Sequence, residues 1–264
     1  MSTIPMTTDD LPLTELQLRV AEMILATPAP GKHAARSAVS HIKKSWAIRA
    51  IDKEMSAFRA ITGEEESVTA LFHSLKRLKY SNAEKLDPRN HVHKAAMHSF
   101  LAAIENNLHL AELNQLKPAL QVDVSQEVPI FKTRITLTYS SGEQIALYPV
   151  PPLNFTMDHE GKPYDFTDEL LELTKQPNLD KVYRHVRHLA NRRNQLLYAS
   201  HEGVPSIPDL PDSFILARRD RVFRNLTLYL LIDPFEVQPF VQQVLDAFLK
   251  LLRLLPRELE AQES

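Results

Sequence analysis

The spacing of hydrophobic residues constrains the fold of this chain more than any other feature, because its period changes twice along the sequence. Apolar residues recur at helical spacing from about residue 34 to 116, alternate with polar residues from 130 to 149, and return to helical spacing from 180 to 255. A period of 3.6 residues indicates amphipathic helices, and a period of 2 indicates strands. The sequence therefore predicts a mainly α fold, a helical bundle with an inserted β-hairpin.

The same pattern sets the expected elements. Long helices are predicted at 34–80, 88–116, 180–202, 212–232 and 237–255, with shorter ones at 12–27 and 165–175. The hairpin at 130–149 turns at Ser141 and Gly142, a third short strand is expected at 120–124, and 154–163 is expected to be a loop. Gly63 interrupts the longest helix, and a kink and a true break there are equally good interpretations.

Four segments follow from these elements. We expect an N-terminal tail and short helix at 1–33, a first helical part of the bundle at 34–118, the hairpin insertion at 119–165, and a second helical part at 166–258. A chain of 264 residues is long enough for one large core or two modest ones.

Composition excludes several classes of protein. Five glycines are too few for a Gly-rich phosphate loop or a many-turned β fold, and the absence of cysteine excludes disulfides and thiolate metal sites. The net charge of −2 provides no global attraction to nucleic acid, so any such binding would be local. We find no signal-peptide pattern and no apolar run long enough to cross a membrane, which predicts a cytoplasmic protein.

The segment 181–205 concentrates arginine, histidine, asparagine and tyrosine on one predicted helix, which Asp180 begins and Gly203 and Pro205 end. Arg193 lies at the centre of its apolar stripe. A buried, unpaired charge costs several kcal/mol or more. Arg193 is therefore expected to meet a carboxylate, a phosphate or another subunit.

A carboxylate stands in a similar position on an earlier helix. Glu65, in the segment GEEES, falls among Phe58, Ile61 and Phe72 on the helical wheel, with Glu64 and Glu66 on either side. Glu65 is the nearest partner for Arg193 by residue type. The alternative is a helix that begins at Gly63 and carries these acids in its first turn, where the helix dipole favours them.

Histidines cluster at the start of the predicted helix 88–116, at His91, His93 and His98. No two of them are four residues apart, and no carboxylate stands at metal-site spacing, so we expect surface histidines rather than a metal centre. The sequence contains no nucleotide-loop, zinc-protease or serine-hydrolase motif, and no cofactor is expected.

The run RNQLLYASH, from Arg193 to His201, resembles the active motif of the HEPN superfamily, small all-helical domains of prokaryotic toxins and antiviral defence proteins. Arg193 and Asn194 match its opening dipeptide, and the end of the helix matches its context. The family places four to six residues between arginine and histidine, whereas seven separate Arg193 from His201. Tyr198 stands inside the family's window.

The resemblance implies a metal-independent endoribonuclease whose site is completed at a dimer interface. It implies catalytic roles for Arg193, Asn194, His201 and Tyr198, with Glu65, Glu66, His188 and Arg192 in support. It also implies RNA as a partner, together with an antitoxin or a defence protein. A homodimer is expected on the helices at 180–202 and 237–255, because both carry a wide apolar face.

Two alternatives belong to other functional classes. One is a catalytically inactive helical dimer that binds RNA or a protein. The other is an all-helical interaction protein in which Arg193 pairs with Glu65 inside the core.

Overall fold

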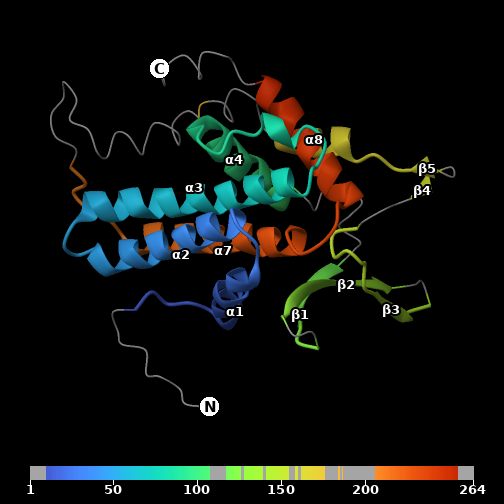
Figure 1. Cartoon of the computed structure of the whole chain (residues 1–264), viewed down its shortest axis with the longest axis horizontal. Helices are drawn as coiled ribbons and strands as arrows, with labels where there is room; N and C mark the ends of the chain where they lie inside the picture. The colour runs from blue at the N-terminus through green and yellow to red at the C-terminus, as the bar shows by residue number, and fades with distance from the viewer. Residues whose placement is uncertain are drawn as a thin grey trace.

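The fold is mainly helical with a small antiparallel sheet at one end of the bundle, as predicted (Figure 1). It is given by a computed structural model of the chain. The structure describes residues 10–107, 117–125, 128–138, 141–154, 158–159, 162–175, 184, 186 and 206–254.

Most helices lie close to their predicted positions. The described helices and 3-10 turns are α1 (Glu15–Met23), η1 (Ile24–Ala26), α2 (Gly31–Ile48), α3 (Lys53–Arg77), η2 (Ala83–Lys85), α4 (His91–Asn107), α5 (Thr167–Lys175), α7 (Asp212–Ile232) and α8 (Pro239–Leu254). Arg184 and Val186 are also helical. The predicted helix at 212–232 is confirmed at both ends.

The prediction of one long helix over 34–80 is wrong. α2 ends at Ile48, a turn follows, and Asp52 begins α3 by accepting a hydrogen bond from the backbone nitrogen of Met55 at 2.8 Å. The apolar pattern continues across this turn because the buried faces of α2 and α3 continue one another on a helical wheel. Gly63, where we expected a kink or a break, lies inside α3.

Gly63 instead allows α2 and α3 to pack closely. A Cβ atom at this position would lie 3.1 Å from the backbone oxygen of Ala38 and 3.4 Å from the Cβ of His41. Ala38 is completely buried at this contact. Because Gly63 has no side chain, the backbones of the two helices can approach each other there. The glycine thus serves helix contact rather than helix termination.

Gly63→Val is expected to lower the free energy of unfolding by about 1–3 kcal/mol, the usual cost of overpacking a tight site. Ala47→Val is the matched control, because Ala47 is exposed on α2 and its change carries only a small cost in helix propensity. Urea denaturation of both variants measures the difference. Equal stabilities would contradict the close contact at Gly63.

The sheet contains the predicted hairpin and the predicted third strand. β1 (Lys117–Asp123), β2 (Ile130–Thr138) and β3 (Gln144–Leu147) pair antiparallel in that order. Gly142 takes a positive φ of 85° in the turn between β2 and β3. The segment expected to be a loop contains the two-residue strands β4 (Asp158–His159) and β5 (Lys162–Pro163), which pair with each other.

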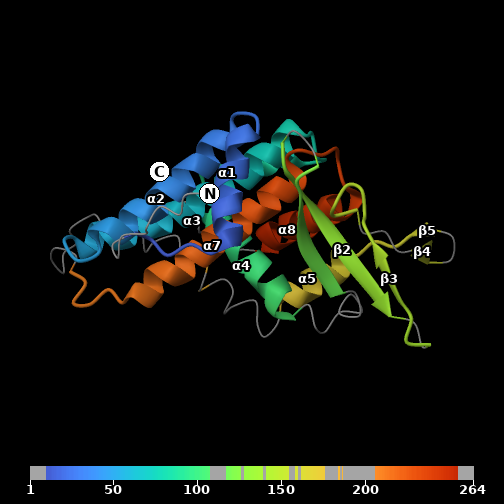
Figure 2. The same cartoon turned by 90° about the horizontal axis from the view of Figure 1, so that it is seen from below.

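The sheet is anchored through β2, since a small sheet needs support to be stable. Phe131 and Ile135 are buried, and β2 contacts α7. Figure 2 shows the three strands at the end of the bundle near α8. The buried side chains of β2 therefore add to the edge of the helical core.

Helices from both predicted helical parts contribute to one hydrophobic cluster. It includes Val20 of α1, Phe72 of α3, Phe100 of α4, Leu226 of α7 and Phe248 of α8. The apolar face of α8, which we expected at a dimer interface, is thus largely buried within the same chain. The homodimer stays a prediction. Among the described residues, no helix combines the length and the apolar character needed to cross a membrane.

Candidate functional site: a buried charged cluster

The residues of the RNQLLYASH motif lie outside the described part of the chain. This applies to Arg193, Asn194, Tyr198 and His201, and to the supporting residues His188 and Arg192. Glu65 and Glu66 are described, and both lie on α3.

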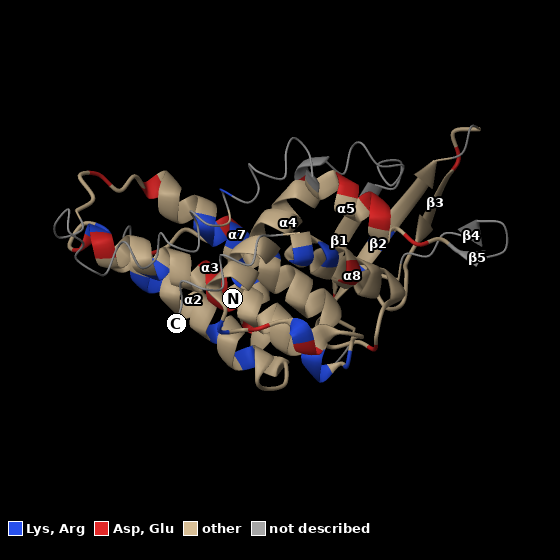
Figure 3. Ribbon diagram, turned by 90° about the horizontal axis from the view of Figure 1, so that it is seen from above, with Lys and Arg blue, Asp and Glu red and all other residues tan. Residues whose placement is uncertain are grey.

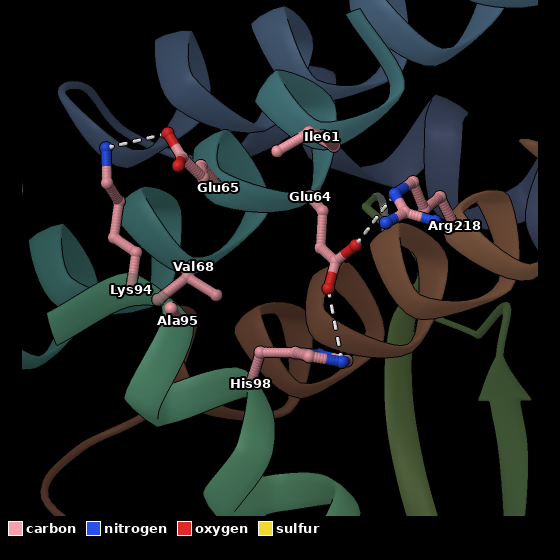
Figure 4. Close-up of a pocket in the computed structure, with 8 residues that line it drawn as sticks. All are labelled: Ile61, Glu64, Glu65, Val68, Lys94, Ala95, His98 and Arg218. Carbon is pink, nitrogen blue, oxygen red and sulfur yellow. Dashed lines mark ion pairs between the residues drawn. The ribbon is translucent and has the colours of Figure 1, made fainter. Parts of the chain in front are cut away.

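Glu65 is buried, as its place on the apolar stripe predicted, with 9% of its surface exposed. Its two carboxylate oxygens each lie 2.9 Å from Nδ1 of His91. Oε2 of Glu65 also lies 3.3 Å from Nζ of Lys94, a pair that Figure 4 shows. The alternative of a helix beginning at Gly63 is wrong, because α3 starts ten residues earlier, at Lys53. Glu65 is held by α4, and its predicted pairing with Arg193 is outside the described residues. Glu66 is half-buried.

Glu64 occupies the centre of the cluster. Its Oε1 lies 3.2 Å from Nε2 of His98, and its Oε2 lies 3.6 Å from Nε of Arg218 and 3.8 Å from Nη1 of Arg221. Figure 4 shows His98 and Arg218 approaching this carboxylate from α4 and α7. One carboxylate on α3 is thus shared by two other helices.

A buried polar contact next to Glu64 fixes the position of α7 against α3. Nδ2 of Asn225 donates to Oγ of Ser67 at 2.9 Å, and that hydroxyl donates to the backbone oxygen of Glu64 at 2.6 Å. Asn225 and Ser67 are completely buried. Buried polar groups need such partners, so this chain of hydrogen bonds holds the arginine face of α7 toward Glu64.

His98 is a buried histidine, which corrects the expectation of surface histidines on α4. Burial lowers its pKa to about 4; Glu64 opposes this effect, and Arg221, Arg224 and Arg218 add to it. His98 is therefore neutral near pH 7. Its contact with Glu64, 3.2 Å between Nε2 and Oε1, is therefore not an ion pair at that pH.

The partners of the two ring nitrogens indicate the tautomer of His98. Nε2 lies against the Glu64 carboxylate, and Nη2 of Arg224 lies 3.4 Å from Nδ1. A carboxylate only accepts and a guanidinium only donates. The proton is therefore on Nε2, and Nδ1 is an acceptor that faces the arginines.

Three arginines on α7 form a row from the core to the surface. The side chain of Arg218 is 7% exposed, that of Arg224 26% and that of Arg221 37%. Arg218 stacks on the Phe214 ring at 3.7 Å, and Arg224 pairs with Glu105. Nε of Arg224 is buried with no hydrogen-bond partner in the described part of the chain. Figure 3 shows the basic segments of α7 in blue.

A cavity of about 30 Å³ lies between Glu64, Glu65, Lys94, His98 and Arg218, with Ile61, Val68 and Ala95 completing its wall. This volume is enough for about one or two water molecules. A nucleotide does not fit inside it. A large anion would therefore meet the cluster from its exposed arginines.

The cluster carries more positive than negative charge. Lys94 pairs with Glu65, Arg218 and Arg221 lie near Glu64, and Arg224 pairs with Glu105, so four cations meet three carboxylates. Arginine and lysine in excess over carboxylates favour binding of an anion, and arginine suits the planar recognition of phosphate. Among the described residues, no group of histidines and carboxylates could hold a metal ion.

The buried histidine gives stability a defined pH dependence. Folding lowers the pKa of His98 from 6.5 to about 4, so between these values the unfolded chain binds a proton that the folded chain excludes. The contribution of neutral His98 to the free energy of unfolding is therefore fully present above about pH 6.5. It is lost progressively as the pH falls toward 4, by up to about 3 kcal/mol.

His98→Gln is expected to flatten this slope in denaturation measured at several pH values. Burial also lowers the pKa of His73, so the diagnostic is the difference between wild type and variant. His33→Gln, at an exposed position on α2, is the control. An unchanged slope in His98→Gln would contradict a neutral, buried His98.

Sequence reasoning missed most of this cluster. Lys94, His98 and Arg218 were not predicted from the sequence to be site residues. The missed signal is that Arg218 stands three residues after Ile215 and four before Val222, both completely buried. It is a charge on an apolar stripe, like Arg193 and Glu65.

Comparison of the chain with protein-family models, with curated proteins and with solved structures gives no match.

Proposed function

We propose that this protein is a HEPN-like, metal-independent endoribonuclease in which the buried charged cluster supports the reacting groups. Arg193, Asn194, His201 and Tyr198 would act on the RNA, as the resemblance of RNQLLYASH implies. Glu64, Glu65, His98 and the α7 arginines would order and charge the adjoining part of the site. A cytoplasmic role in a prokaryotic toxin or antiviral defence system, as a homodimer with a neutralising partner, belongs to the same proposal.

The observation that carries the proposal is the arrangement around Glu64. A neutral histidine and a row of arginines from two other helices converge on one buried carboxylate, and the row continues to the surface. Strongly perturbed titratable groups beside a cavity are a recurrent property of functional sites.

The chemistry requires three functions and no metal. A base takes the proton of the 2′-hydroxyl, which attacks phosphorus, and an acid gives a proton to the departing 5′-oxygen. The products are a 2′,3′-cyclic phosphate and a free 5′-hydroxyl. A histidine with a pKa near neutrality suits both proton transfers. Arginine stabilises the charge that develops on the phosphate oxygens.

Within this scheme His98 is a positioning residue. Its low pKa keeps it neutral, and its Nδ1 holds Arg224 by accepting a hydrogen bond. Arg221 and Arg224 are the more exposed cations of the cluster and would contact a phosphate at its surface. Glu64 compensates the buried charge of Arg218, and a phosphate would compete with Glu64 for Arg221 and with Glu105 for Arg224.

A second function is favoured by a specific observation, the depth of burial. The side chains of Glu64, Glu65, Lys94, His98 and Arg218 are between 6% and 11% exposed. Such a cluster also suits a structural ion network that fixes the packing of α3, α4 and α7. In that case the protein is an all-helical interaction protein without nuclease activity.

Incubating the purified protein with RNA in excess EDTA separates the two functions. The ribonuclease is expected to cleave RNA under these conditions and to leave DNA of the same sequence intact, because DNA lacks the attacking 2′-hydroxyl. Cleavage that EDTA stops would contradict the metal-independent mechanism. No cleavage of any RNA would favour the structural network.

A further inference from the structure

The exposed face of α2 carries a concentration of positive charge that the proposed catalytic site does not use. Between Glu22 and Asp52 the sequence has no acidic residue, yet it contains Lys32, Arg36, Lys43, Lys44 and Arg49 together with two histidines. The chain as a whole has a net charge of −2, so this segment departs strongly from the average.

Helical spacing places the exposed members of this set on one side of α2. His33, Arg36, Lys43 and Lys44 are exposed, and Ser37 and Ser40 lie half-buried between them. The opposite side buries Ala35, Ala38 and Ile42 in the core. Positions 33, 36, 40, 43, 44 follow the three- and four-residue steps of one helix face. Figure 3 shows the repeated blue segments along α2.

Within the described residues, these cations lack acidic partners, which several other cations of the chain have. In the described part of the structure, Arg36, Lys43 and Lys44 form no ion pair, whereas Arg49 pairs with Asp212 and Lys250 pairs with Asp168. Unpaired like charges on one face repel each other weakly in water. An external polyanion would be attracted to all of these cations and would offset the repulsion between them.

We infer that this face of α2, defined by His33, Arg36, Ser40, Lys43 and Lys44, is a docking surface for the phosphate backbone of RNA. From His33 to Lys44 it spans about 16 Å, at 1.5 Å per residue. The serine hydroxyls between the cations are further donors for phosphate oxygens. No aromatic residue lies on the face, and Trp46 is buried. Without base stacking, the surface binds the backbone independently of sequence.

An anionic membrane is the other polyanion to consider, and the packing of α2 disfavours it. A helix that lies on a membrane inserts its apolar face between the lipids. The apolar face of α2 is already occupied by α3 and α7. The exposed residues of the face are charged or small and polar, which suits a phosphate backbone.

The inference rests on the proposed function only in naming RNA rather than DNA. The surface is separate from the cluster around Glu64, which lies between α3, α4 and α7. Binding on α2 would hold RNA on the protein without contributing to bond cleavage. Loss of binding and loss of cleavage can therefore be measured separately.

The test measures binding of a fluorescent 2′-O-methyl RNA, which cannot be cleaved because its 2′-oxygen is blocked, over a range of salt concentrations. The triple variant Arg36→Gln, Lys43→Gln, Lys44→Gln is expected to bind on the order of tenfold or more weakly. The slope of log affinity against log salt should fall in magnitude by about 2, at roughly 0.7 per lost phosphate contact. The control triple Lys85→Gln, Arg89→Gln, Arg253→Gln removes the same charge from exposed sites away from α2 and should leave both values unchanged.

Equal loss of affinity in the two triples would overturn the inference, because general charge would then explain the binding. Wild-type protein that binds vesicles containing phosphatidylserine and not the RNA would overturn it as well. DNA bound as tightly as RNA, with the same loss in the α2 triple, would support the surface and contradict the choice of RNA. If RNA binding is lost in the α2 triple while Arg193→Ala binds normally, the surface stands whatever the outcome for cleavage.

Discussion

Glu64→Ala is expected to lower the free energy of unfolding by about 3–5 kcal/mol, the range observed when one partner of a buried ion pair is removed. The carboxylate of Glu64 is the group on which His98, Arg218 and Arg221 converge, and Arg218 is 6% exposed. Its removal leaves a buried guanidinium with less compensation and removes the acceptor of the His98 proton. Chemical denaturation monitored by circular dichroism measures the effect.

Two further variants make this prediction specific. Glu84→Ala removes a carboxylate at an exposed position and should change stability by no more than about 0.5 kcal/mol. The double variant Glu64→Gln, Arg218→Met should recover part of the loss, since a buried pair can often be replaced by uncharged groups at little cost. A loss in Glu64→Ala as small as that in Glu84→Ala would show that the cluster is solvated.

Arg193→Ala is expected to reduce the rate of RNA cleavage by a factor on the order of 10² to 10³, the effect of losing one stabilising contact to a developing oxyanion. The circular dichroism spectrum should stay that of the folded protein. Arg184→Ala is the control: Arg184 belongs to the same predicted helix and is exposed. Its cleavage rate should remain within the range of wild type.

Two other results would contradict a catalytic role for Arg193. If Arg193→Ala unfolds the protein, and Glu65→Gln combined with Arg193→Met restores much of the stability, then Arg193 is a structural partner of Glu65. If neither stability nor cleavage changes, Arg193 lies on the surface and the assignment of the motif is wrong.

The period of the hydrophobic pattern was enough to predict the fold class, the three-stranded sheet and α7. It failed at residues 49–52, because α2 and α3 bury faces that continue one another on a helical wheel. The signal that separates the two helices is local, because Asp52 caps the start of α3. Gly63 was the more visible candidate for a break, but its role is set by the distance to the Ala38 backbone, and no single-helix pattern contains that distance.

Two members of the candidate cluster could be foreseen from the sequence. The position of Glu65 on an apolar stripe predicted its burial, and the same criterion applied to Arg218 would have found a second member. His98 could not be assigned in this way, because its environment depends on α3 and α7, which are distant in sequence. Which carboxylate pairs with which cation is decided by tertiary packing, as the contacts of Glu65 with His91 and Lys94 illustrate.

The proposed ribonuclease activity is tested most directly by identifying the ends of RNA fragments formed by wild-type protein in excess EDTA. We expect fragments with a 2′,3′-cyclic phosphate and a free 5′-hydroxyl, produced by wild type and Arg184→Ala and lost in Arg193→Ala. Fragments carrying a 5′-phosphate, or a requirement for divalent metal, would contradict it. Cleavage of equal rate in Arg193→Ala would contradict it as well, because the activity would then not depend on the motif.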